Sequence, residues 1–89
     1  QGCFSFNGDL NWDVSSVLDM SNLFNNCTSF NGNISDWDVS SVTNMNYMFY
    51  ICSDFNQNIS RWAVDNVRTH QNIFVGCSID DKNKPKRFR

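Results

Sequence analysis

Apolar residues recur along this chain with a period of about 25 positions. Four cysteines, at positions 3, 27, 52 and 77, are spaced 24, 25 and 25 residues apart. The columns between them hold one residue type in every copy: Phe6, Phe30 and Phe55; Asn7, Asn31 and Asn56; Trp12, Trp37 and Trp62; Val14, Val39 and Val64; Phe24, Phe49 and Phe74. Uniform columns at a fixed period indicate a repeat protein. We therefore divide the chain into a unit 1–79, with repeats 3–26, 27–51 and 52–76, and a tail 80–89.

Two local periods can be read within a repeat. Residues 33–39 alternate apolar and polar and carry aromatic and β-branched side chains, which predicts a short strand. Val42, Met45 and Phe49 then recur at spacings of three and four, behind serines suited to cap a helix. One short parallel strand and one short helix or helical turn would make one coil, so the pattern predicts a repeat solenoid of about three coils.

Stacked coils would place each column on its own copy one coil away. The Phe, Trp and Val columns are then the predicted core. The Asn column is expected to hydrogen-bond the turn backbone of adjacent coils. The cysteine column (Cys3, Cys27, Cys52 and Cys77) is open to two interpretations. Cys3 could pair with Cys27 and Cys52 with Cys77, or the column could be a buried ladder of free thiols.

Composition supports turns over long helices. The chain has fourteen Asn, eleven Ser and nine Asp but no Glu, and the first three favour turns and caps. Residues 1–79 carry a net charge of −5 and residues 80–89 a net charge of +3. No apolar run is long enough to span a membrane. The first residue is Gln1 and not Met, which fits a cleaved product or a fragment.

No constellation of catalytic or metal-binding residues can be identified. Asp13 and Asp38 share a column, but Ala63 interrupts it, so a solvated acidic face is favoured over a calcium site. The lone His70 stands in a Met column and is interpreted as a packed or capping residue. Repetition gives rows of like side chains and not three different ones that converge on a cleft. We expect no enzyme activity and no cofactor.

Two surface features remain. Asn26, Asn33 and Asn58 fit the N-glycosylation acceptor pattern, which matters only in a eukaryotic secreted protein. The basic tail could be disordered, could bind nucleic acid, or could lie on the acidic face of the same or a neighbouring copy, held by Phe88. The acidic body argues against nucleic acid. The candidate contact residues of the tail are Lys84, Lys86, Arg87, Phe88 and Arg89.

The second repeat also carries a family resemblance. Its run FNGNISDWDVSSVTNMNYMF, followed by Cys52, resembles the repeat of about 25 residues in mycoplasma-type lipoproteins and listerial surface proteins, a relative of the BspA-like leucine-rich repeats. The resemblance covers residues 3–77 and implies a leucine-rich-repeat-like solenoid, an extracellular or cell-surface location, and adhesion or partner binding. The third repeat departs from the pattern at Ala63, Asp65, Arg68 and His70.

A solenoid with open ends leaves apolar rows and strand edges uncovered. The chain could be cut from a longer array, capped by its tail, or stacked end to end with copies of itself. The leading hypothesis is a non-catalytic structural protein that self-associates head to tail into a filament or surface layer. The alternative is an adhesin-type module that recognises a host protein or glycan.

Overall fold

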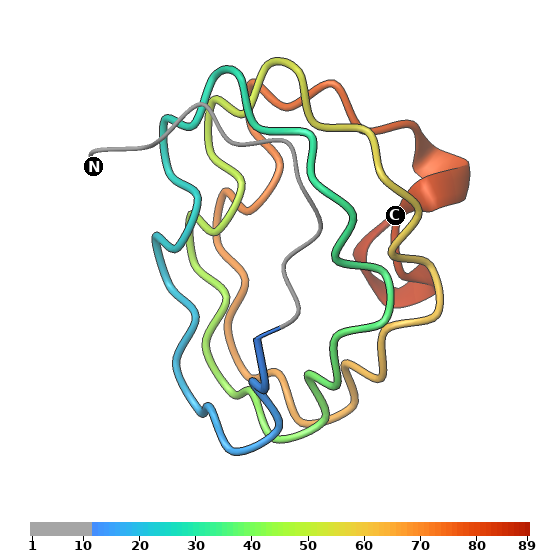
Figure 1. The fold of residues 1–89 in the computed structure, drawn as a ribbon. Coiled ribbons are helices and arrows are strands. Elements are labelled where there is room, and N and C mark those ends of the chain that lie inside the picture. Colours follow the sequence, from blue (N-terminus) through green and yellow to red (C-terminus); the bar gives the residue numbers. More distant parts are fainter. Residues whose placement is uncertain (1–11) are drawn as a thin grey trace.

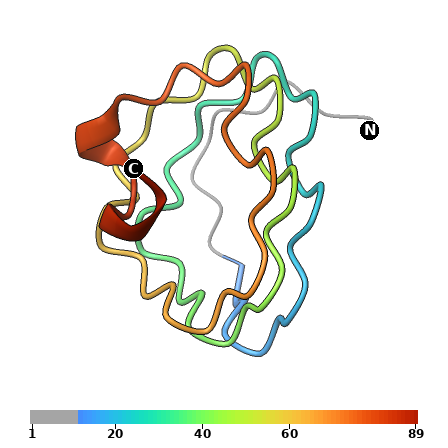
Figure 2. The ribbon, with the colours of Figure 1, turned by 180° about the vertical axis from the view of Figure 1, so that it is seen from behind.

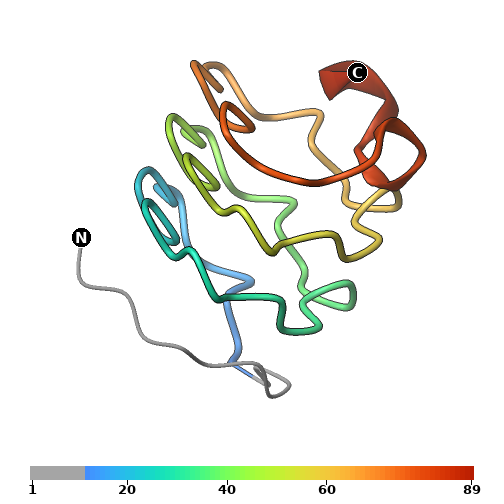
Figure 3. The same ribbon diagram turned by 90° about the horizontal axis from the view of Figure 1, so that it is seen from above.

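Residues 12–89 are described by the computed structural model. From Trp12 onward the chain winds in successive layers (Figure 1). The end of the first repeat, residues 12–26, forms the first layer. Repeats 27–51 and 52–76 form the second and third layers. Figure 3 shows the successive layers stacked next to one another. Isolated parallel bridges join Asp19 to Asn44 and Asn44 to Thr69, so equivalent residues of successive layers lie side by side.

The predicted leucine-rich-repeat-like solenoid of strand-and-helix coils is wrong. Residues 12–89 contain no α-helix and no β-strand, only bridges, turns and two 3-10 helices in the tail, η1 (Asp81–Asn83) and η2 (Lys86–Phe88). The molecule is a compact globule whose principal extents are 28, 25 and 22 Å. Repetition is real, but the described parts of the repeats lack the secondary structure expected within them.

Tight turns replace the predicted strand and helix. The N–H groups of Trp37, Val42, Met48 and Cys52 each donate to the carbonyl three residues earlier. The first and last residues of these turns are Ile34 and Trp37, Val39 and Val42, Met45 and Met48, and Phe49 and Cys52, and all are buried. The apolar spacing of three therefore marks successive turn corners and not one face of a helix.

Short polar side chains hold the turns from outside. In the predicted strand, Asn33 Oδ1 accepts hydrogen bonds from the backbone N–H and the hydroxyl of Ser35, at 3.0 and 2.7 Å. Asp38 Oδ1 accepts the same pair from Ser40, at 3.0 and 2.6 Å. Such Asx turns compete with strand and helix for the backbone. Ser40, expected to cap a helix, instead donates to the residue that starts a turn.

One segment of each layer makes most of the backbone hydrogen bonds between layers, and we call it the arm: residues 19–26, 44–51 and 69–76. Alternate N–H groups of the first arm donate to carbonyls of the second, as from Met20 to Asn44 at 2.9 Å and from Phe24 to Met48 at 2.9 Å. The second arm donates to the third in the same register, as from Met45 to Thr69 at 2.9 Å and from Phe49 to Ile73 at 3.0 Å.

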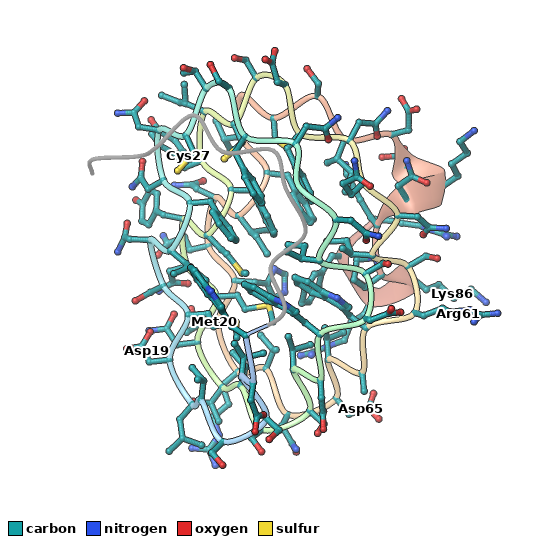
Figure 4. The ribbon with its side chains drawn as sticks, viewed as in Figure 1. Asp19, Met20, Cys27, Arg61, Asp65 and Lys86 are labelled. Carbon is teal, nitrogen blue, oxygen red and sulfur yellow. The ribbon has the colours of Figure 1, made fainter. Side chains whose placement is uncertain are left out.

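The core is a stack of aromatic rings between the arms and the opposite side of each layer. Phe24 lies over Phe49 with ring centroids 5.6 Å apart, and Phe49 over Phe74 at 5.8 Å. Phe30 lies over Phe55 with ring centroids 5.7 Å apart. Between one layer and the next, Phe30 also stacks on Phe24 at 4.2 Å, and Phe55 on Phe49 at 4.4 Å. Figure 4 shows Met20 directed into this interior and its neighbour Asp19 directed outward.

Two positions of every arm have a left-handed backbone. The first is Asn22, Tyr47 and Asn72, with φ of 62°, 57° and 54°. The second is Asn26, Ile51 and Gly76, with φ of 67°, 58° and 76°. Asn and Gly tolerate this region, whereas a β-branched residue is strained in it. At Gly76 a Cβ would also lie 3.1 Å from the Cα atom of Ile51.

We expect Ile51→Asn to stabilise the protein. The change relieves left-handed strain of about 1–2 kcal/mol and loses part of a half-buried side chain, for a net gain of about 1 kcal/mol. Thermal unfolding should then show a midpoint several degrees higher, about 4–8 °C per kcal/mol for a domain of this size. Gly76→Ala, which adds a Cβ in the same column, should lower the midpoint. Equal midpoints for the three proteins would contradict this explanation.

Candidate interaction surface

The predicted core residues fall into two groups. Phe24, Phe30, Val39, Phe49 and Phe55 are at most 1% exposed, and Val14, Trp37, Trp62 and Val64 at most 8%. Phe74 is only partly buried, and Trp12, in the first layer, is 51% exposed although it stacks on Trp37 at 6.0 Å. Phe6 lies outside the described residues. The Trp column thus changes from buried to exposed at the first layer.

The first layer exposes a second apolar side chain in the same way. Leu23 is 39% exposed, whereas Met48 and Ile73 in its column are 0% and 5% exposed. The backbone of this arm is also open: within residues 12–89, the carbonyls of Asp19, Ser21, Leu23 and Asn25 accept no backbone N–H. Among residues 12–89, therefore, no further layer covers this face of the first layer.

The Asn column links layers by its side chains. Asn31 Oδ1 accepts the backbone N–H of Asn56 at 2.9 Å, and Asn56 Oδ1 accepts the backbone N–H of Asp80 at 2.8 Å. Asn7 lies outside the described residues. Because Asp80 is the first residue of the tail, the column continues one step beyond the third layer. The start of the tail thus occupies the place of a fourth layer.

The tail is folded against the third layer and not disordered. Phe88 is 9% exposed and lies 4.3 Å from the ring of His70 between centroids, and Pro85 is fully buried. Both 3-10 helices lie together on one side of the last layer (Figures 1 and 2). Of the three possibilities considered for the open ends, capping of the chain by its own tail corresponds to this packing at the third layer.

Among residues 12–89, no ion pair joins the tail to an acidic side chain of the body. Arg87 donates through its guanidinium to the backbone carbonyls of Val64 and Val67, the latter at 2.7 Å. Lys84 lies 5.3 Å above the ring of Phe74, and its ion pair is with Asp81 of the tail itself, at 2.9 Å. Of the three interpretations of the tail, contact with acidic side chains of the body is therefore not found within its own copy among residues 12–89, whereas Phe88 does pack on the body.

The remaining candidate contacts of the tail are exposed. Lys86 projects outward in Figure 4, and the guanidinium of Arg89 donates a 3.5 Å hydrogen bond to the carbonyl of Lys82. The three glycosylation candidates, Asn26, Asn33 and Asn58, are exposed as well, although Asn33 and Asn58 each hold an Asx turn. None of these residues gathers into one site.

The acidic side chains are used locally. Hydrogen bonds from Ser15, Ser21 and Ser40 lower the pKa values of Asp13, Asp19 and Asp38, respectively. Within residues 12–89, no three His, Cys, Asp or Glu side chains are grouped so as to hold a metal ion. A shallow polar pocket on the outer side is lined by Ser35, Asp36, Asn58 and Arg61.

The cysteine column divides. Cys27 is disulfide-bonded, while Cys52 and Cys77 are free thiols, so of the two interpretations the second pair follows the free-thiol one. Cys3, the partner that the disulfide interpretation gives to Cys27, lies outside the described residues. Cys52 is fully buried and donates its S–H to the carbonyl of Phe24 at 2.8 Å. Burial raises the pKa of Cys52 to about 12 and also raises the pKa of Cys77.

Sequence reasoning missed two features of this surface. One is the left-handed column, for which Asn26 and Gly76 were the available signal. The other is the fourth-layer role of the tail. Ile79 precedes Asp80 as Phe55 precedes Asn56, and Ile79 is 7% exposed, so it takes the place of the Phe column. A gap of one residue and a change from Phe to Ile conceal this continuation in the sequence.

One family model, described as "Mycoplasma protein of unknown function, DUF285", matches residues 1–86. No curated protein and no solved structure matches the chain. Within residues 12–89, no helix is long and apolar enough to cross a membrane.

We expect Cys52 to resist alkylation in the folded protein. At pH 8 a thiol whose pKa is about 12 holds on the order of 1000-fold less thiolate than one at the ordinary value of 9.0. In a Cys77→Ser variant, peptide mass spectrometry after iodoacetamide treatment should find Cys52 unlabelled in buffer and labelled in urea. Labelling at similar rates in both would mean that Cys52 is accessible in the native layers.

Proposed function

Because this chain belongs to the family described as Mycoplasma protein of unknown function, DUF285, we propose a role from its own surfaces: a non-catalytic structural protein that associates with copies of itself, head to tail, at the cell surface or outside the cell. The observation that carries the proposal is the uncovered first layer, with Trp12 and Leu23 exposed although their column partners are buried. A further layer of the same repeat is the surface that fits this face.

The backbone supports the same proposal. The first arm offers a row of carbonyls, at alternate residues from 19 to 25, that accept no backbone N–H within the described part of the chain, and both existing contacts between arms use such a row. Unpaired main-chain groups at an edge are a template for another chain. Head-to-tail contacts that do not close into a ring give an open filament on repeated association, and such filaments side by side would give a surface layer.

The location rests on the resemblance of the second repeat to surface repeats of mycoplasma-type and listerial proteins. A disulfide at Cys27 is in keeping with an oxidising environment outside the cell. A non-catalytic role follows from the rows of like side chains, which repeat one chemical group and do not combine different ones. We propose no nucleic-acid partner, because the basic tail is packed on the body and the body is acidic.

An adhesin-type module is the second candidate. The outer side of the second arm carries Tyr47 and Tyr50, both half-buried, with ring centroids 5.2 Å apart in an edge-to-face arrangement. Asn72 donates a hydrogen bond to the Tyr47 hydroxyl at 3.2 Å, so aromatic rings and amide groups share this surface. Such groups suit a host protein or glycan, which stacks on rings and accepts or donates hydrogen bonds.

Sedimentation velocity over a wide range of concentration tests self-association. We expect the average mass of the wild-type protein to rise with concentration, and Leu23→Lys to prevent the rise because it places a charge on the uncovered face. Leu18→Lys is the matched control: Leu18 is 61% exposed, and Thr43 and Arg68 occupy its column. A protein that stays monomeric at the highest concentration even after Arg87 or Phe88 of the tail is changed to alanine would contradict self-association, and saturable binding of such a monomer to a surface ligand would favour the adhesin.

A further inference from the structure

The third arm carries the counterpart of the open carbonyl row. Within residues 12–89, the backbone N–H groups of His70, Asn72, Phe74 and Gly76 donate to no acceptor. Their equivalents in the first arm, Met20 to Asn26, and in the second arm, Met45 to Ile51, all donate to the next layer. The last arm is thus a row of four donors that points along the stack, away from the layers beneath it.

The register of a further contact is set by the two that exist. Met20 N–H donates to Asn44 C=O, and Met45 N–H donates to Thr69 C=O. Asp19, Asn44 and Thr69 occupy one column. The next donor in the series is His70, and its acceptor would be Asp19 of a second copy. In the same way Asn72, Phe74 and Gly76 would donate to Ser21, Leu23 and Asn25 of that copy.

The shape of the backbone restricts which chain can bind the donor row. The donor row includes two left-handed residues four positions apart, Asn72 and Gly76. An ordinary extended peptide lacks this shape. The first arm has it at Asn22 and Asn26, and both existing contacts join arms that match at these positions. A second copy of this chain is therefore the occupant that fits.

The tail already covers the other half of the last layer and reaches His70, the first residue of the donor row. Asn83 C=O accepts the N–H of Ile59 at 2.9 Å, Arg87 binds the carbonyls of Val64 and Val67, and Phe88 covers His70. A second copy in the register above would bring Val14, Val17 and Met20 over Val64, Val67 and His70. The tail and the second copy cannot occupy this space together.

From this overlap we infer that the tail is a removable cap: it occupies the place of the next copy's first layer and thereby limits head-to-tail assembly, and when it is displaced the surface beneath it and the donor row of the third arm bind a second copy. The inference rests on the proposed self-association and names the surface and its regulation. Only uncapped molecules can bind a second copy. The apparent affinity is therefore the intrinsic affinity multiplied by the fraction of molecules that are uncapped.

Tail variants of the whole chain test the inference by sedimentation velocity. Arg87→Ala removes the guanidinium contacts with Val64 and Val67, and Phe88→Ala removes the anchor on His70. We expect both to assemble at protein concentrations at least about tenfold lower than the wild-type protein needs. Lys86→Ala is the matched control for Arg87→Ala, because it removes the same charge from the neighbouring residue, whose side chain makes no hydrogen bond or ion pair among residues 12–89, and it should behave like the wild-type protein.

A third change separates specific docking from aggregation of an unfolded or uncovered protein. Adding Leu23→Lys to Phe88→Ala should restore the monomer, whereas adding Leu18→Lys should not. If the wild-type protein and both tail variants assemble at the same concentration, the cap is wrong and self-association stands. If no variant assembles, self-association is wrong and the cap with it. Assembly of Phe88→Ala that Leu23→Lys does not prevent would also overturn the proposed register.

Discussion

Hydrogen bonds between successive arms are the interaction on which the rest of this structure depends. An arm is a run of turns with two left-handed residues, and alternate N–H groups in it find no acceptor within their own layer. The neighbouring arm supplies the acceptors, from Met20 to Asn44 and from Met45 to Thr69. Buried amides must be paired, so each arm requires a copy of itself on either side. Identical layers meet this requirement because identical backbones present donors and acceptors in one register.

Aromatic stacking follows from that register. Once the arms are aligned, Phe24, Phe49 and Phe74 lie over one another at 5.6 and 5.8 Å. A layer of about 25 residues is too small to bury its own Phe side chains, and the neighbouring layer covers them. The two ends of the stack are then the places where the requirement is unmet. The tail covers part of the third layer, with Ile79 in the Phe column and Asp80 in the Asn column. Nothing within residues 12–89 covers Leu23 at the first layer.

The sequence could predict the columns but not the local structure between them. Like residues recur because like positions pack together, so the stacking of Phe30 on Phe55 was predictable from spacing alone. A spacing of three fits a helical face and a series of turn corners equally, and the choice depends on Asn33, Asp38 and the left-handed positions, which terminate regular structure. Of the candidate surface, the role of Phe88 as an anchor could be predicted from the sequence. The open donor row could not, because the N–H groups that lack acceptors can be identified only once the layers are assembled.

Amide hydrogen exchange in a dilute, monomeric sample tests the contact between arms most directly. Tyr47 and Ile51 donate to the next arm at 2.9 and 2.8 Å, whereas Asn72 and Gly76 hold the same column positions and have no acceptor within the described residues. The layered arrangement predicts slow exchange for the first pair and fast exchange for the second. Equal exchange rates for the two pairs would contradict it.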